Sequence, residues 1–135
     1  MERMTAKDAA ELIFDAWIEM GDEGMSQAQT LNETRLTPKQ FKNGKDWLRE
    51  HLCIDNIQPF TYDPRVNVYR LNTEAERVEE YWLYRLRITA RQMEQLLNGT
   101  GGPAKQKFKN RKFNRLFRNT ENILEDIKDI LEGAV

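Results

Sequence analysis

The sequence predicts a mainly α-helical protein that contains one small β-hairpin and ends in two long helices. Three observations predict this fold class. Apolar residues recur at helical spacing over most of the chain, and capping-box patterns mark the helix starts. Between residues 57 and 71 the pattern changes to short aromatic and β-branched segments, which favour strands. We therefore expect one domain over residues 1–72 and a helical region over residues 73–135.

Three helices are predicted before the hairpin. The first starts at the capping box Thr5–Asp8 and ends at Gly21–Gly24. A short second helix runs from Ser26 to about Glu33. The third starts at Thr37–Gln40, where Pro38 suits the first turn, and runs to about His51. The expected core positions are Ala10, Ile13, Phe14, Trp17 and Met20 for the first helix, Met25 and Leu31 for the second, Leu36 for the turn, and Phe41, Trp47 and Leu48 for the third.

One glycine and one proline add detail to this first domain. Gly44 faces inward with Phe41 and Leu48, so we expect it to let two helices approach closely despite the roughly 1 kcal/mol that a mid-helix glycine costs. The hairpin is predicted over residues 57–62 and 67–71. Pro59 cannot donate to a strand ladder, which makes its strand an edge strand.

The sequence of residues 73–135 predicts a helical hairpin that also serves as a dimerisation element. One helix opens at Thr73–Glu76 and runs to about Asn98, and Gly99–Pro103 is expected to break it cleanly. The last helix covers about 105–132, with a possible interruption at Asn119–Thr120. Helices of this length cannot both be covered by one three-helix core, so they fold back, pair with a second subunit, or both. The dimerisation candidates are the apolar positions Trp82, Leu86, Met93, Leu116, Phe117, Ile123, Leu124, Ile127 and Ile130.

Composition excludes several classes of function. The 135 residues contain one cysteine, Cys53, and one histidine, His51, which rules out an internal disulfide and leaves too few ligands for a Cys/His zinc site. The carboxylates are scattered, and no glycine-rich phosphate loop follows a strand. We expect no enzyme activity, no cofactor and no metal. With no apolar run near 20 residues and no signal-peptide pattern, we expect a soluble cytoplasmic protein with no membrane partner.

Charge is segregated although the formal net charge is only −1. Residues 35–49 are basic apart from Asp46, and residues 101–119 contain no acid. Such islands suggest local contacts with a polyanion. Alternatively, each island faces an acidic surface of the same fold or of a partner subunit, with Glu76, Glu79 and Glu80 as candidates for the second island.

The order of helix, short helix, helix and hairpin over residues 5–72 resembles the winged helix-turn-helix superfamily, with residues 24–50 as its helix-turn-helix core. The runs Leu36–Phe41 and Trp47–His51 are similar to small winged-helix proteins of the RacP type from actinobacteria and their phages. The resemblance implies a protein that binds double-stranded DNA with its third helix. A two-fold dimer would then place two such helices on half-sites about one duplex turn apart, and the protein would associate with the nucleoid.

Within this interpretation each candidate residue has an expected role. Gln40 and Asn43 suit adenine, and Lys39 and Lys42 suit guanine or phosphate. The other candidates are expected at the turn, on the same helix, at the hairpin tip and in the basic segment 105–118: Arg35, Thr37, Asp46, Arg49, Arg65, Asn67, Lys105, Lys107, Lys109 and Arg111. For the third helix the simpler alternative is an ordinary solvated face.

The function predicted first is a sequence-specific, dimeric transcriptional regulator, with a phage or a mobile element as a candidate source. Two alternatives stay open. One is a protein-interaction module, such as a winged-helix adaptor, antirepressor or inhibitor. The other is a replication-associated protein that holds single strands through residues 105–118, where aromatic residues alternate with cations.

Overall fold

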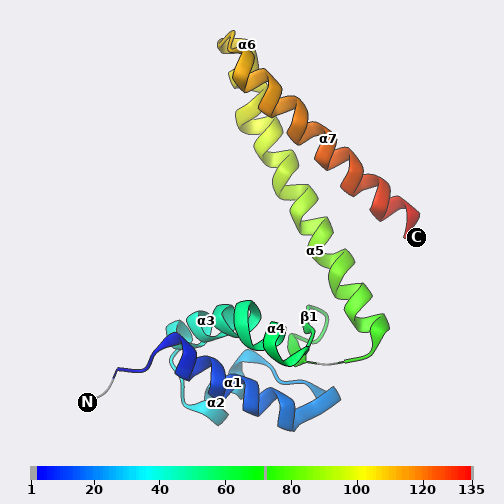
Figure 1. The fold of residues 1–135 in the computed structure, drawn as a ribbon. Helices are drawn as coiled ribbons and strands as arrows, with labels where there is room; N and C mark the ends of the chain where they lie inside the picture. Colours follow the sequence, from blue (N-terminus) through cyan, green and yellow to red (C-terminus); the bar gives the residue numbers. More distant parts are fainter. Residues whose placement is uncertain (1–2, 72, 135) are drawn as a thin grey trace. The chain divides into compact units, whose positions relative to one another are not determined.

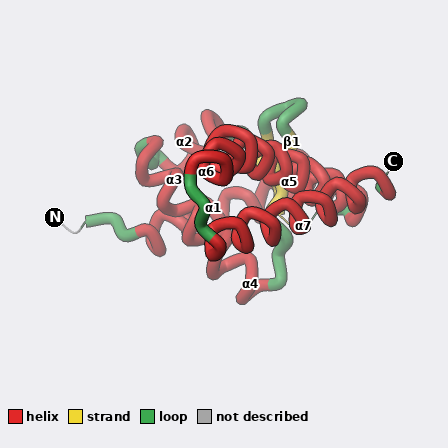
Figure 2. Tube along the Cα trace, turned by 90° about the horizontal axis from the view of Figure 1, so that it is seen from above, coloured by secondary structure: helices red, strands yellow, loops and turns green. Residues whose placement is uncertain are grey.

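The computed structural model describes residues 3–71 and 73–134 and is mainly helical, with one two-stranded antiparallel sheet (Figure 1). The tube view shows the same dominance of helix (Figure 2). Two compact units divide the chain: an N-terminal unit, Met1–Tyr81, and a C-terminal unit, Trp82–Val135. Residue 72, where we expected the domain boundary, lies outside the described residues. The elements, with η2 and η3 as π-helical turns, are α1 (Ala6–Met20), η1 (Gly21–Glu23), α2 (Gln27–Thr34), α3 (Pro38–Trp47), η2 (Leu48–Leu52), α4 (Cys53–Asn56), β1 (Phe60–Asp63), β2 (Val68–Leu71), α5 (Ala75–Leu96), η3 (Leu97–Gly101), α6 (Gly102–Lys107) and α7 (Arg111–Gly133).

Local hydrogen bonds start the first three helices where the sequence predicts. The hydroxyls of Thr5, Ser26 and Thr37 each accept a hydrogen bond from the backbone N–H three residues later, at 3.1–3.2 Å. The side chains at those later positions return a bond to the N-cap backbone. Each capping box satisfies two amide groups that the helix itself leaves unpaired. The predicted helix starts are therefore confirmed.

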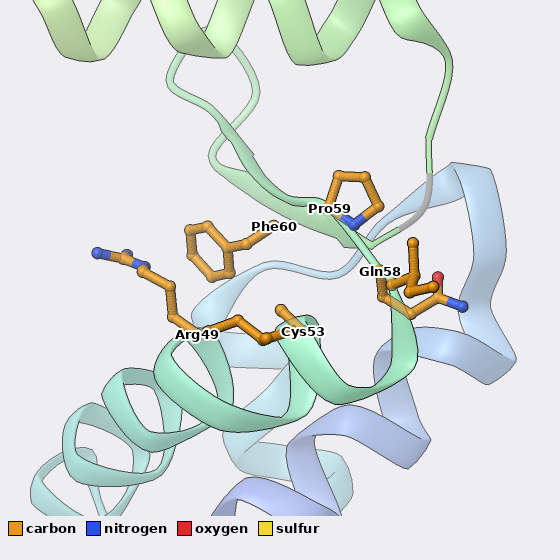
Figure 3. Close-up of a pocket in the computed structure, with 7 residues that line it drawn as sticks. Arg49, Cys53, Gln58, Pro59 and Phe60 are labelled. Carbon is orange, nitrogen blue, oxygen red and sulfur yellow. The ribbon is translucent and has the colours of Figure 1, made fainter.

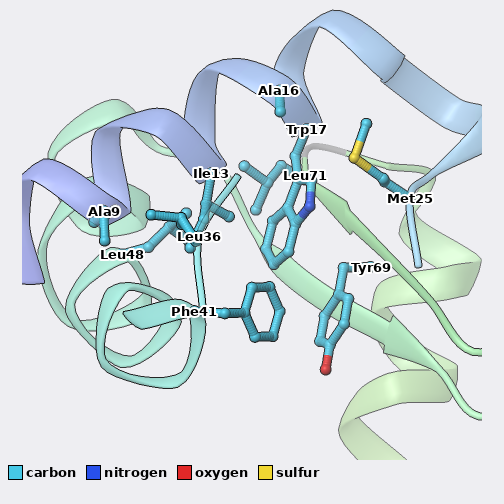
Figure 4. Close-up of a cluster of buried hydrophobic side chains, with 11 residues drawn as sticks. Ala9, Ile13, Ala16, Trp17, Met25, Leu36, Phe41, Leu48, Tyr69 and Leu71 are labelled. Carbon is cyan, nitrogen blue, oxygen red and sulfur yellow. The ribbon is translucent and has the colours of Figure 1, made fainter. Parts of the chain in front are cut away.

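The core of the N-terminal unit is built around the indole of Trp17. Its ring stacks on that of Tyr69 with centroids 4.8 Å apart and an angle of 7°, while Phe41 meets it edge-on at 6.2 Å. Figure 4 shows Phe41 reaching this cluster from α3 and Tyr69 reaching it from β2. Aromatic contacts of this kind add about 0.5–1.5 kcal/mol each to the burial of apolar area. The expected burial of Ile13, Trp17, Leu36, Phe41 and Leu48 is confirmed.

At Gly44, α3 approaches α1 closely. A Cβ at this position would lie 2.8 Å from Cβ of Ala9 and 3.0 Å from the backbone N of Ala10. The predicted role of Gly44 in close helix packing is confirmed.

The hairpin is joined to the segment before α2 by backbone hydrogen bonds between Met25 and Tyr69. Phe60 pairs with Leu71 and Asp63 pairs with Val68 in the antiparallel ladder. Met25 then forms a bridge with Tyr69, in which each N–H donates to the other's carbonyl at 3.0 and 2.9 Å. Met25 is buried, but its expected place inside the second helix is wrong. Its backbone pairs with β2 because α2 begins only after the Ser26 cap.

Two predicted helix ends are also wrong. The third helix continues past His51 through η2 and α4 to Asn56, where Ile57 takes a left-handed conformation with φ of 53°. Gly99–Pro103 does not break the chain's helical path, because η3 leads directly into α6. Pro103, which has no N–H to donate, lies in the first turn of α6, directly after the π-helical turn.

The break in the C-terminal region lies at residues 108–110 instead of at Asn119–Thr120. Asn110 caps α7 by accepting a hydrogen bond from the N–H of Phe113 at 3.1 Å. The hydroxyl of Thr120 donates to the carbonyl of Leu116 at 2.9 Å, so this polar side chain is satisfied inside a continuous helix.

The C-terminal unit is a helical hairpin in which α7 packs back on the second half of α5. Ala90, Leu97 and Leu124 are its buried residues. Lys128 and Glu94 form an ion pair of 2.7 Å across the two helices. A Cβ at Gly101 would lie 2.5 Å from the Phe117 ring, so this glycine provides close packing instead of ending a helix. Further apolar side chains pack against the core from both helices: Met93, Phe117, Ile127 and Leu131.

Candidate nucleic-acid interface

Helix α3 separates its two sides sharply. Phe41, Gly44 and Leu48 are buried against the rest of the N-terminal unit. The opposite side is exposed, and within the described part of the chain its polar side chains make no recorded hydrogen bond or ion pair. These exposed residues are Lys39, Lys42, Asn43 and Asp46. Within the N-terminal unit, nothing covers this side of α3, so a partner molecule can reach it.

Two candidate side chains at the start of α3 are already engaged. Oε1 of Gln40 accepts the N–H of Thr37 at 2.9 Å, and Oγ1 of Thr37 accepts the N–H of Gln40 at 3.2 Å. A glutamine needs both its amide oxygen and its amide nitrogen to read adenine. The amide oxygen of Gln40 already accepts the capping bond, whereas Asn43 carries no such bond.

The other cations near α3 differ in what they contact. Arg35 is exposed in a left-handed conformation, with φ of 61°, at the end of α2. The guanidinium of Arg49 lies 4.2 Å from the centroid of Phe60, so it packs on the start of β1. Lys45, which the sequence did not single out, holds its ammonium 5.5 Å from Phe41 and 5.4 Å from Tyr69. Lys45 and Arg49 thus support the aromatic cluster.

At the hairpin tip both candidate side chains have internal partners. Arg65 contacts Asp63 at 3.2 Å and Glu80 at 3.0 Å. The hydrogen bond from Arg65 lowers the pKa of Asp63, and its partner carboxylates raise the pKa of Arg65. Asn67, with φ of 56°, accepts a hydrogen bond from the Tyr62 hydroxyl at 2.8 Å. These bonds hold both side chains against the turn itself.

A hollow of about 420 Å³ lies where α4 meets the hairpin (Figure 3). Cys53 lines it beside Arg49 and Phe60, and burial raises the pKa of its thiol to about 11, against the opposing effect of Arg49. A thiol with that pKa is protonated at neutral pH and is a poor nucleophile. The buried Oε1 of Gln58 has no hydrogen-bond partner among the described residues.

A second hollow, of about 560 Å³, lies mostly against the basic segment 105–118 and is open to solvent. Nζ of Lys105 lies 5.3 Å from the centroid of the Phe117 ring. Nζ of Lys107 lies 5.7 Å from the centroid of the exposed Phe108 ring. Lys109 and Arg111 are exposed. The hollow is lined by residues of α6 and α7: Lys105, Arg111, Asn114, Arg115, Arg118 and Glu121.

The dimerisation candidates fall into two groups. Leu124 is buried inside the helical hairpin, and Leu86, Met93, Phe117 and Ile127 are partly buried. The remaining candidates stay more than half exposed: Trp82, Leu116, Ile123 and Ile130.

Comparison with protein-family models, with curated proteins and with solved structures finds no match to this chain. In residues 3–71 and 73–134, no group of three His, Cys, Asp or Glu side chains is placed to hold a metal ion. Nor does any helix in these residues combine the length and the apolar character that crossing a bilayer requires.

Proposed function

We propose that the chain is a protein that binds double-stranded DNA at specific sequences. In this proposal it is a dimeric transcriptional regulator whose N-terminal unit is a winged helix-turn-helix. The observation that carries this proposal is the outer side of α3. On this side Lys42 and Asn43 are exposed to solvent, while Phe41 and Leu48, on the opposite side, anchor the helix in the core. A major groove about 12 Å wide admits a single helix held in this way.

The roles of the exposed residues follow from their chemistry. The free amide of Asn43 can donate to and accept from one adenine, which specifies a base. Lys39 and Lys42 offer ammonium groups that suit guanine or phosphate. Arg35 lies just before the start of α3, where phosphates are favoured by the amide groups and the helix dipole.

The hairpin serves as the wing in this proposal. Arg65 would exchange its exposed ion pair with Glu80 for a phosphate oxygen. The exchange costs little, because exposed pairs of this kind contribute about 0–1 kcal/mol.

The proposal is tested by selecting bound duplexes from a random pool and then comparing Lys42→Ala and Asn43→Ala on the selected sequence. We expect Asn43→Ala to lose about tenfold or more in affinity and to relax the preference at one base pair. Lys42→Ala should weaken all duplexes similarly and reduce the slope of affinity against salt by about one. Lys7→Ala, at an exposed position of α1, is the matched control. Unchanged affinity of both variants at low salt would refute the proposal.

Salt dependence separates DNA binding from the alternative of a protein-interaction module. Phosphate contacts lose affinity on a logarithmic slope of about −0.9 for each phosphate neutralised. A selected duplex whose binding shows no such slope would favour the protein-interaction module.

A second function, binding of single strands, is favoured by Phe108. Its exposed ring stands next to Lys107 and close in sequence to the basic hollow, and base stacking on an aromatic ring is worth about 1–3 kcal/mol. If this function holds, Phe108→Ala weakens binding of a single-stranded probe and leaves duplex binding unchanged. If the wild type and Phe108→Ala bind the single strand equally well, this second function is excluded.

A further inference from the structure

One row of apolar residues on α7 remains uncovered in the C-terminal unit. Leu116, Ile123 and Ile130 recur every seven residues and are 56%, 52% and 54% exposed. A strict repeat of seven keeps residues on one side of a helix and is typical of a seam between paired helices.

Helical spacing places this row on a defined side of the helical hairpin. The ion pair of Glu94 and Lys128 marks one edge of the contact between α5 and α7. At about 100° per residue, Ile123 and Ile130 lie on the edge opposite to Lys128. Leu96 of α5, 57% exposed, likewise lies on the edge opposite to Glu94. Both helices therefore contribute apolar side chains to the same open side.

A graded series of charges runs beside the apolar row, on its outward side. Every member is exposed, and the series is basic near the start of α7, neutral in the middle and acidic near the end. Its members, at alternating spacings of three and four, are Lys112, Arg115, Asn119, Asn122, Asp126 and Asp129.

We propose that α7 pairs antiparallel with α7 of a second copy of this chain, about a two-fold axis near Ile123. In that arrangement Leu116 of one copy meets Ile130 of the other, and Arg115 lies near Asp129 of the second copy. A parallel pair would instead set like charges opposite each other at both ends, which destabilises an interface.

The apolar and charged patterns agree on where the axis lies. The apolar row is centred on Ile123, and the charge series is centred between Thr120 and Glu121, within one helical turn. The inference gives the proposed dimer an orientation and a register. It rests on the dimer of the proposed function, and its tests contain no DNA, so their failure leaves the α3 experiments informative.

Cysteine pairs test the orientation directly. In a Cys53→Ser chain, two copies of Leu116→Cys would stand about 21 Å apart in the antiparallel pair, because 14 residues separate them along the helix. A disulfide needs Cα atoms closer than about 7 Å. We expect a mixture of the Leu116→Cys and Ile130→Cys chains to form disulfide-linked dimers, and each chain alone to form none. Dimers from either chain alone, or none from the mixture, would overturn the proposal.

Charge reversal tests the register by light scattering at tens of micromolar. The wild type should be dimeric. Lys112→Glu with Arg115→Glu should shift the population towards monomer, as should Asp126→Lys with Asp129→Lys. Mixing the two variants should restore dimers, because each end then meets the opposite charge. Ile123→Glu should also dissociate the dimer, whereas Ile54→Glu, at a more exposed apolar position of the N-terminal unit, should not. A monomeric wild type, or variants that stay dimeric, would contradict this register.

Discussion

The indole N–H of Trp17 donates a hydrogen bond of 2.9 Å to the hydroxyl of Thr30, and this bond joins α1 to α2 inside the core. Both residues are almost fully buried, at 1% and 0% exposed. The same hydroxyl donates to the carbonyl of Ser26 at 2.7 Å. Thr30 therefore satisfies a buried indole donor and at the same time places its own proton on the first turn of α2.

Thr30→Val should lower the free energy of unfolding by about 1–3 kcal/mol, because it removes the acceptor and leaves the indole donor of Trp17 buried without a partner. Chemical denaturation monitored by tryptophan fluorescence measures the loss. Thr30→Ser, which keeps the hydroxyl, should lose clearly less. Equal stability of the valine variant and the wild type would contradict the role of this bond.

Gly44→Ala should destabilise the N-terminal unit although alanine is the better helix former. The added methyl would lie 2.8 Å from Cβ of Ala9, and overpacking of this kind costs about 1–3 kcal/mol, against a gain in helix propensity of about 1 kcal/mol. Gly99→Ala is the control, since nothing lies within 4 Å of its added methyl. Thermal unfolding should show a lower midpoint for Gly44→Ala and no drop for Gly99→Ala.

Cys53 should resist alkylation in the folded protein. Its pKa, raised from the ordinary value of 9.0 to about 11, leaves on the order of a hundredfold less thiolate than an unperturbed cysteine. We expect iodoacetamide to modify the native chain far more slowly than the chain in denaturant at pH 8, with the native rate rising steeply towards pH 11. Equal rates in both states would show that the burial of this thiol is not maintained in solution.

Asp63 should make the stability of the N-terminal unit depend on acid pH. Its pKa is lowered mainly by the hydrogen bond from Arg65, so its folded value lies below its unfolded value. Its contribution is then fully present above the unfolded value of about 3.9 and is lost as the pH falls through the folded value. The difference in unfolding free energy between the wild type and Asp63→Asn should shrink from pH 7 to pH 2. Asp15→Asn, at an exposed position on α1, is the matched control.

Much of the N-terminal unit could be predicted because local chemistry decides it. Thr5, Ser26 and Thr37 start helices through bonds to residues only three positions away. The spacing of Phe41, Gly44 and Leu48 is enough to identify the buried side of α3.

Contacts between distant segments could not be predicted in this way. Met25 is paired with Tyr69, and nothing in the residues around Met25 signals that bridge. Gly101 has the local appearance of a helix breaker, yet the ring of Phe117 fixes its role as a packing position.

The candidate site shows the same division. Exposure of Lys42 and Asn43 follows from helical spacing alone. Arg65 also forms an ion pair with Glu80, fifteen residues later in the chain, and no local pattern predicts that pair. Gln40 was expected both to cap α3 and to read a base, and the bond lengths show that its oxygen is used for the cap.

The bridge between Met25 and Tyr69 has a consequence for synthesis of the protein. The core that surrounds Trp17 includes Tyr69 and Leu71, from the last strand of the N-terminal unit. While the ribosome is still making the first three helices, the ring of Tyr69 does not yet cover Trp17. The backbone of Met25 likewise lacks the hydrogen bonds that it later forms with Tyr69. The nascent chain must therefore keep this surface from aggregating until residue 71 has left the exit tunnel.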